Sequence, residues 1–109
     1  MQIRELDLKE LESVYDVLKQ LYTKLTYKEF EDLIYDMRYM DYKMLGVFEQ
    51  DILISYAGVS ILTTLKNKRH LKVFDFYTDR KYDVLKYDKI MKGYLDDFAK
   101  VGMCEKVIF

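Results

Sequence analysis

The fold is decided by residues 70–109, which read HLKVFDFYT (70–78), DRKYDVLKYD (79–88), KIMKGYLDDFAK (89–100) and VGMCEKVIF (101–109). The first string has the aromatic and β-branched content of a strand. The third repeats apolar residues at helical spacing, and Gly102 ends that helix as a left-handed cap. The last string finishes in a short apolar strand over 104–109. A strand, a helix and a strand in this order predict two parallel strands with a right-handed crossover.

Further strands are predicted before this segment. Residues 42–49, 52–65 and 71–78 have strand-like runs separated by short polar turns, and they predict an antiparallel meander. Residues 2–6 predict a short first strand. Gly58 lies in the middle of the longest run, and a glycine inside a strand indicates a bulge or a close approach to the backbone.

Two amphipathic helices are predicted between the first strand and the meander. Each begins with a capping box, formed by Asp7 with Glu10 and by Thr26 with Glu29. Apolar residues then recur at three- and four-residue spacing, which predicts core-facing stripes. The stripes consist of Leu11, Val14, Tyr15, Leu18, Leu21 and Tyr22 in the first helix, and Phe30, Leu33, Ile34 and Met37 in the second.

Composition predicts one globular domain over residues 1–109. Half of the residues are hydrophobic, and 18 basic residues oppose 19 acidic ones. This balance gives no electrostatic case for a nucleic-acid partner, and no apolar run is long enough for a membrane helix. Cys104 is the only cysteine and His70 the only histidine, so we expect neither an internal disulfide nor a zinc site. We expect a cytoplasmic protein.

The order of these elements resembles the GNAT superfamily of N-acetyltransferases. The string YAGVSILTTLKNKRHLKVFDFYTD (56–79) and the helix KIMKGYLDDFAK (89–100) are similar to a common bacterial branch of that family. The resemblance implies an α+β fold with a central, mixed but mainly antiparallel sheet and helices on both faces, without the last two strands of the usual fold. It also implies transfer of an acetyl group from acetyl-CoA to an amine.

In GNAT enzymes the loop after the fourth strand carries small residues that let backbone N–H groups approach the pyrophosphate of CoA. The family pattern is Gln or Arg, two residues, Gly, one residue, then Gly or Ala. Here Asp83, Lys86 and Asp88 stand at the three defining positions, and all four glycines lie elsewhere. We therefore expect acetyl-CoA binding and acetyl transfer to be weak or lost. In the simpler alternative, Asp79 or Asp83 only caps the following helix.

The resemblance also implies site residues. Asp75, on the fourth strand, is the candidate catalytic carboxylate, and its alternative is an aspartate on the face of the sheet that is paired with a lysine or solvated. The candidate cofactor-binding residues are Phe76, Tyr77, Thr78, Lys86 and Lys89. Cys104 is expected to be a small core residue rather than a nucleophile, because His70 is expected at the far end of the sheet.

Two functional interpretations remain open. The first is a GNAT-type acetyltransferase. The second is a non-catalytic module with this fold that acts in dimerisation, partner binding or small-ligand binding. The fifth strand would be an uncovered edge flanked by Val107 and Phe109, so we expect a homodimer formed through this strand.

Overall fold

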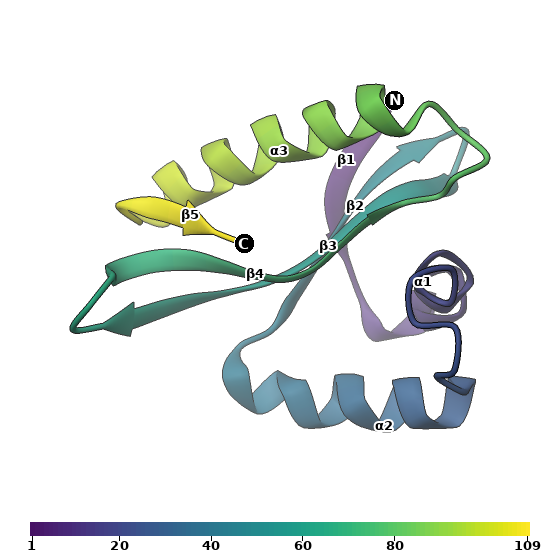
Figure 1. Cartoon of the computed structure of the whole chain (residues 1–109), viewed down its shortest axis with the longest axis horizontal. Coiled ribbons are helices and arrows are strands. Elements are labelled where there is room, and N and C mark those ends of the chain that lie inside the picture. Colours follow the sequence, from purple (N-terminus) through teal and green to yellow (C-terminus); the bar gives the residue numbers. More distant parts are fainter.

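A five-stranded sheet lies between two helical layers in the computed structural model, which describes residues 1–109 (Figure 1). The strands are β1 (Gln2–Leu6), β2 (Lys43–Glu49), β3 (Ile52–Thr64), β4 (Lys68–Thr78) and β5 (Lys106–Ile108). The helices are α1 (Leu11–Leu18), α2 (Tyr27–Met37) and α3 (Val84–Val101), with short 3₁₀ turns η1 (Leu8–Glu10) and η2 (Arg38–Met40). The strand order is β1-β2-β3-β4-β5, and only β4 and β5 pair in parallel. The predicted α+β fold class, with a mixed and mainly antiparallel sheet, is confirmed.

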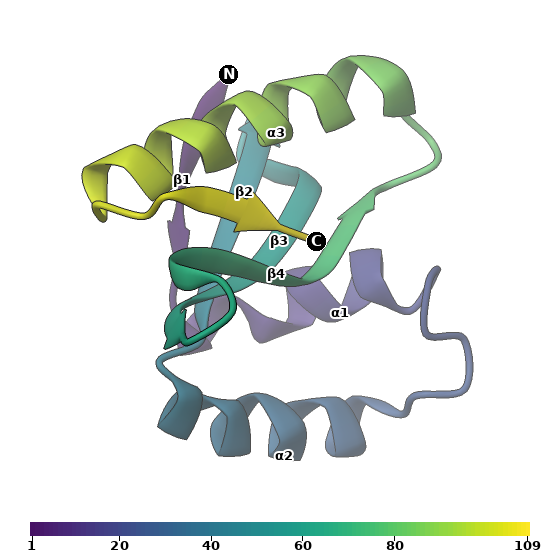
Figure 2. The same cartoon turned by 60° about the vertical axis from the view of Figure 1, so that its left-hand side comes forward.

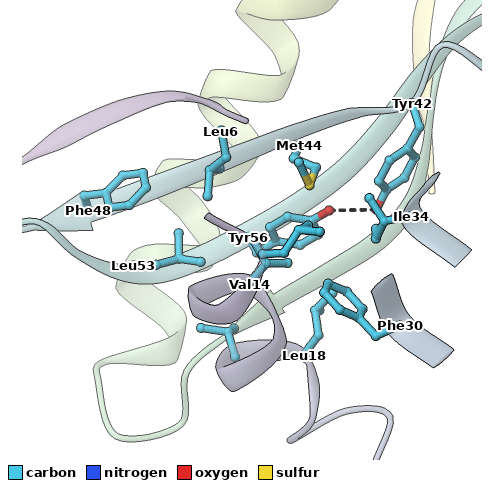
Figure 3. Packing of buried hydrophobic residues seen from close by; sticks show 12 residues of the cluster. Leu6, Val14, Leu18, Phe30, Ile34, Tyr42, Met44, Phe48, Leu53 and Tyr56 are labelled. Carbon is cyan, nitrogen blue, oxygen red and sulfur yellow. Dashed lines mark hydrogen bonds between the residues drawn. The ribbon is translucent and has the colours of Figure 1, made fainter. Parts of the chain in front are cut away.

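The helices cover both faces of the sheet. Helix α3 lies on one face, and α1 and α2 lie on the other (Figures 1 and 2). Each face has its own apolar core. The core on the α3 face is built around Leu45, Ile54, Leu71, Met91 and Leu95. The core on the α1/α2 face includes Leu6, Val14, Leu18, Phe30, Ile34, Tyr42, Met44, Phe48, Leu53 and Tyr56 (Figure 3).

Local capping chemistry sets where the helical segments begin. The side chain of Asp7 accepts the N–H of Lys9, and Glu10 accepts the N–H of Asp7. The same reciprocal arrangement joins Thr26 and Glu29 at the start of α2. Both capping boxes predicted from the sequence are confirmed. Replacing such a cap by alanine typically costs about 1 kcal/mol.

Gly58 fulfils both roles that a strand glycine suggests. The register of β3 and β4 shifts beside it, because Gly58 pairs with Asp75 while Val59 pairs with Val73. One extra residue, Phe74, therefore lies in β4. The phenol of Tyr42 also packs directly on Gly58, since a Cβ added there would lie 1.6 Å from the Tyr42 hydroxyl oxygen. The predicted bulge and the predicted close approach are both confirmed.

The bulge determines which way Asp75 faces. Side chains of a strand alternate between faces, so one inserted residue reverses every side chain beyond it. Val73 packs in the core on the α3 face, and Phe74 packs on the α1/α2 face. Asp75 follows on the α1/α2 face as well, where it meets Tyr42. Without the bulge, alternation would have directed Asp75 toward α3.

Four local predictions were wrong. Helix α1 ends at Leu18, four residues before the end of the predicted stripe. Gly102 has φ −79°, and the left-handed residue is Met103 with φ 57°. Gly102 is needed for space, because a Cβ there would lie 2.8 Å from the Ile61 side chain. Strand β5 covers three residues rather than the six predicted. His70, which was expected at the far end of the sheet from Cys104, instead pairs with Lys106, two residues after Cys104 in the chain.

None of the three helices combines the length and the apolar character needed to span a membrane.

Candidate functional site

Four polar side chains form one hydrogen-bonded cluster on the α1/α2 face of the sheet. The hydroxyl of Tyr22 donates to Asp75 Oδ1 and that of Tyr42 to Asp75 Oδ2, both at 2.6 Å. The Tyr42 and Tyr56 hydroxyl oxygens lie 2.8 Å apart (Figure 3). We call Tyr22, Tyr42, Tyr56 and Asp75 the Tyr–Asp cluster. It joins the segment after α1, the start of β2, and strands β3 and β4.

Three members of the Tyr–Asp cluster, Tyr22, Tyr42 and Asp75, line a largely apolar pocket of about 600 Å³. We call this cavity the α1–α2 pocket, because the end of α1, the connection to α2, and α2 itself form most of its wall. Its apolar lining residues are Leu18, Leu25, Phe30, Leu33, Ile34 and Met37, together with Tyr22 and Tyr42. The remaining lining residues are Thr23, Lys24, Glu29 and Asp75. A pocket of this size and lining is suited to a small organic molecule.

Burial keeps the tyrosines of the cluster protonated. Burial, followed by the hydrogen bond to Asp75, raises the pKa of Tyr22 to about 12. Burial also raises the pKa of Tyr42 and of Tyr56 well above the usual value for tyrosine. All three hydroxyls therefore retain their protons at neutral pH and can donate them within the cluster.

These shifts predict a loss of stability at alkaline pH. A folded-state pKa above the unfolded value of about 10 means that the stabilisation is fully present below pH 10 and is lost as the pH rises toward 12. We expect the free energy of unfolding of Tyr22→Phe to fall less between pH 9 and pH 11 than that of the wild type. Urea unfolding at each pH measures both slopes. Parallel slopes would contradict the assignment of a raised pKa to Tyr22.

The loop between β4 and α3 is closed by the chain's own acceptors. The N–H groups of Lys81 and Tyr82 donate to the side chain and the carbonyl of Asp79, at 3.0 and 3.1 Å. The N–H of Arg80 donates to Gln20 Oε1 at 3.1 Å. At the start of α3, Lys86 N–H donates to the Asp83 side chain at 3.2 Å. The N–H groups of Arg80, Lys81, Tyr82 and Lys86 are therefore already used within the chain.

Asp88 adds a third carboxylate to this region. Its Oδ1 accepts the Thr78 hydroxyl at 2.6 Å, and the Ser55 hydroxyl lies 2.9 Å from Thr78 Oγ1. Since the one proton of Thr78 points to Asp88, Ser55 is the donor to Thr78. These bonds tie the end of β4 to the first turns of α3. With Asp79 and Asp83 close by in the same loop and turn, the residues present do not fit the diphosphate of CoA.

The candidate cofactor-binding residues are divided between the two faces. Phe76 packs in the core on the α3 face, where its ring centroid lies 5.5 Å from that of Phe109. Tyr77 packs on the opposite face, against the core beneath α1 and α2. Lys86 and Lys89 are exposed on the first turns of α3. The structure thus brings Thr78 and the two lysines to one end of α3 and directs Tyr77 away from them.

The sequence identified Asp75 but not the two tyrosines that bond to it, nor Tyr56, which bonds to Tyr42. Tyr42 and Tyr22 lie 33 and 53 residues from Asp75 in the chain. The available signal was Gly58, since a glycine in mid-strand indicated that some group approaches the backbone there. That group is Tyr42.

Comparisons with known proteins agree with the fold. No family model matches this sequence, and no curated protein matches it. Among solved structures, a GNAT family acetyltransferase from Staphylococcus aureus has a TM-score of 0.85 at 12% identity, covering 98% of this chain and 83% of its own. Glucosamine-6-phosphate N-acetyltransferase from Arabidopsis thaliana has a TM-score of 0.75 at 22% identity, with 98% and 79% covered.

An aminoglycoside N-acetyltransferase in complex with CoA is similar as well. Its TM-score is 0.81 at 12% identity, and the match covers 98% of this chain and 74% of that one. At these identities the comparison establishes the fold. The chain has the architecture of the GNAT acetyltransferases.

Proposed function

We propose that this chain, which has the GNAT acetyltransferase fold, transfers acetyl groups from acetyl-CoA to an amine weakly or not at all, and that it acts as a small-ligand-binding module. The α1–α2 pocket is its working site. The acetyl-transfer activity is implied by the fold, and the expected weakness of that activity follows from the residues in the loop between β4 and α3.

The observation that carries the proposal is the closed loop between β4 and α3. A loop can bind a diphosphate only if its N–H groups are free to donate. Here Gln20, Asp79 and Asp83 accept four of the N–H groups, those of Arg80, Lys81, Tyr82 and Lys86. Binding a diphosphate would break these bonds and place its negative charge beside the three carboxylates of Asp79, Asp83 and Asp88, at a cost that the exposed Lys86 and Lys89 only partly offset.

The α1–α2 pocket supports the second half of the proposal. It lies on the α1/α2 face of the sheet, and the hydrogen bond from Arg80 N–H to Gln20 ties the closed loop to the segment that carries the lining residues Leu18 and Tyr22. Asp75 lines it and is our candidate for contact with a bound ligand. Both Asp75 oxygens already accept a tyrosine proton, which holds the carboxylate in one orientation.

Calorimetric titration with acetyl-CoA tests the proposal. We expect a dissociation constant of about 1 mM or weaker, or about −4 kcal/mol. A micromolar constant, about −8 kcal/mol, would overturn it. In that case Lys86→Ala and Lys89→Ala are the informative variants, because loss of affinity in either would assign the diphosphate to a lysine-based site.

A reopened loop provides the matched gain-of-binding variant. Asp83→Gln, Lys86→Gly and Asp88→Gly together restore the family pattern, and we expect acetyl-CoA affinity to rise at least about tenfold, or about 1.4 kcal/mol. The control variant carries Asp96→Gly and Asp97→Gly, which add the same number of helix glycines at exposed positions of α3. A similar gain in the control would show that the effect comes from loosening the helix.

The uncovered edge of β5 leads us to propose a homodimer as well. In the 109 residues, β5 pairs only with residues 70–72 of β4, and its other edge has no strand partner. Edges of this kind invite pairing with another chain. We expect light scattering to give the mass of a dimer and Ile108→Lys to give monomers or aggregates. Tyr39→Lys, at a residue that is 94% exposed on η2, is the control. A monomeric wild type at high concentration would contradict the proposal.

A further inference from the structure

The turn of the β3–β4 hairpin and the turn between α3 and β5 lie together at one end of the molecule (Figure 1, left). We call residues 64–70 and 100–106 the tip surface. Two hydrogen bonds join its segments: Arg69 Nε donates to the carbonyl of Gly102, and the N–H of Glu105 donates to the carbonyl of Arg69, both at 2.8 Å. The two segments therefore form one surface, and no residue that lines the α1–α2 pocket belongs to it.

The tip surface is basic, although the whole chain has a net charge of −1. Its only acidic residue is Glu105, and its exposed cations are Lys66, Lys68, Arg69, Lys100 and Lys106. None of these cations takes part in the ion pairs of the chain, which all lie elsewhere. Asp96 precedes Lys100 by one helical turn but forms no ion pair with it. The positive charge of the tip surface is therefore available to an anionic partner.

Three apolar side chains protrude among these cations. Leu65, Val101 and Met103 are 104%, 85% and 80% exposed. Only two other large hydrophobic side chains in the chain, those of Tyr39 and Leu85, are at least 80% exposed. Single exposed apolar side chains are normal, but a group of them on one surface indicates a site of interaction.

Two residues of the tip surface have a left-handed backbone that does not suit their type. Lys68 has φ 55° and Met103 has φ 57°. Glycine and asparagine adopt this region at a lower cost than lysine or methionine. Both side chains are exposed, so packing in the core does not explain them. The cation and the apolar group at these two positions therefore point to a role outside the fold.

We propose that the tip surface docks the protein onto an anionic phospholipid membrane. Clusters of about four to eight lysines and arginines bind anionic lipid headgroups. Apolar side chains beside them are buried at the boundary between headgroups and acyl chains. The contact is peripheral, because only the side chains of Leu65, Val101 and Met103 enter the membrane surface. Neither the α1–α2 pocket nor the loop between β4 and α3 takes part, so this role goes beyond the proposed function.

The composition of the tip surface favours a membrane over other anionic partners. Proteins hold single-stranded nucleic acid with aromatic side chains along a basic groove, and residues 64–70 and 100–106 contain no Phe, Tyr or Trp. The tip surface also lacks the tyrosine and tryptophan anchors that dominate protein interfaces. A nucleic-acid backbone has no apolar region to bury Leu65, Val101 and Met103, whereas a lipid surface has one.

Vesicle flotation with the 109-residue protein tests the proposal. One set of vesicles contains phosphatidylcholine alone, and the other contains phosphatidylcholine and anionic phosphatidylglycerol in equal parts. We expect the anionic vesicles to bind the protein at least about tenfold more tightly, since each lysine or arginine near such a surface contributes about fivefold. Added salt should weaken this binding. Equal binding to both sets, or binding to neither, would overturn the proposal.

Two variants at the left-handed positions separate docking from folding. Lys68→Asn and Met103→Asn each remove one group from the tip surface and place there a residue that tolerates positive φ. In urea unfolding, both should be at least as stable as the wild type. Each should bind the anionic vesicles at least about threefold more weakly. Neither residue belongs to β5, so both variants leave the proposed dimer edge intact.

The matched controls remove the same kinds of side chain elsewhere. Lys9→Asn removes an exposed cation, and Leu85→Asn removes an apolar side chain that is 84% exposed. We expect both controls to bind vesicles as the wild type does. Equal losses in the controls, or unchanged binding in Lys68→Asn and Met103→Asn, would overturn the assignment of docking to the tip surface.

Single-stranded DNA serves as the competing anion. At a phosphate concentration equal to that of the anionic lipid, it should leave the protein on the vesicles. Displacement of the protein by the DNA would overturn the membrane as the partner. Acetyl-CoA distinguishes this proposal from the proposed function, because micromolar binding of acetyl-CoA would overturn the proposed function and leave vesicle docking in place.

Discussion

Replacing Gly58 with alanine is expected to destabilise the protein by about 1–3 kcal/mol or more, the range for overpacking a well-filled core. The new Cβ would lie 1.6 Å from the Tyr42 hydroxyl oxygen and 2.2 Å from its Cζ. The ring has no easy retreat, because Tyr42 is buried and its hydroxyl is bonded to both Tyr56 and Asp75. One methyl group therefore displaces the centre of the Tyr–Asp cluster.

Urea unfolding midpoints measure this effect, and Gly93 provides the matched control. Gly93 lies inside α3 with no atom within 4 Å of an added Cβ. Gly93→Ala should therefore stabilise the protein by about 0.5–1 kcal/mol through helix propensity. Tyr42→Leu combined with Gly58→Ala should cost less than the two single changes added together, because the smaller side chain relieves the clash. A neutral Gly58→Ala would mean that Tyr42 does not pack on this glycine.

Replacing Tyr42 with phenylalanine should cost about 1–3 kcal/mol, because it leaves buried polar groups without partners. The Tyr56 hydroxyl, which is fully buried, would lose its acceptor, and Asp75 Oδ2 would lose its donor. Tyr56→Phe should cost less, about 1 kcal/mol, because Tyr42 would still donate to Asp75.

The double variant tests whether the hydroxyls act as one network. With both Tyr42 and Tyr56 changed to phenylalanine, no orphaned hydroxyl remains at Tyr56, so the total cost should be smaller than the sum of the single costs. The free energy of unfolding from urea titrations of the four proteins gives the coupling directly. Additive costs would contradict the network.

Most of the fold could be predicted because its signals are local. The spacing of Thr26 and Glu29 sets the start of α2. Asp83 caps α3, as expected from the simpler interpretation of the loop between β4 and α3. At the β2–β3 turn, Gln50 and Asp51 both have positive φ, as a two-residue hairpin requires. In each case the residues that determine the structure lie within a few positions of one another.

The predictions failed where tertiary contacts decide. Leu21 and Tyr22 continue the helical spacing, yet the chain leaves α1 after Leu18, and the Tyr22 hydroxyl bonds to Asp75. The sequence predicted that Gly102 is a left-handed helix cap. The structure shows that a glycine is needed there because a Cβ would collide with the side chain of Ile61. With eleven tyrosines in the chain, no spacing rule could select the three that form the cluster with Asp75. Only the register of the bulge in β4 brings them together.

The carboxylates of the closed loop have a consequence for how the protein's stability depends on its surroundings. A protein that binds its cofactor gains stability with the cofactor's free concentration and is weaker when the cofactor is scarce. Here Asp79, Asp83 and Asp88 hold the junction of β4 and α3 from within the chain. Such acceptors are covalently attached, so they cannot be diluted or consumed. We expect the unfolding temperature of this protein to stay constant across acetyl-CoA concentrations. The stability of its fold is then independent of how much acetyl-CoA the cell contains.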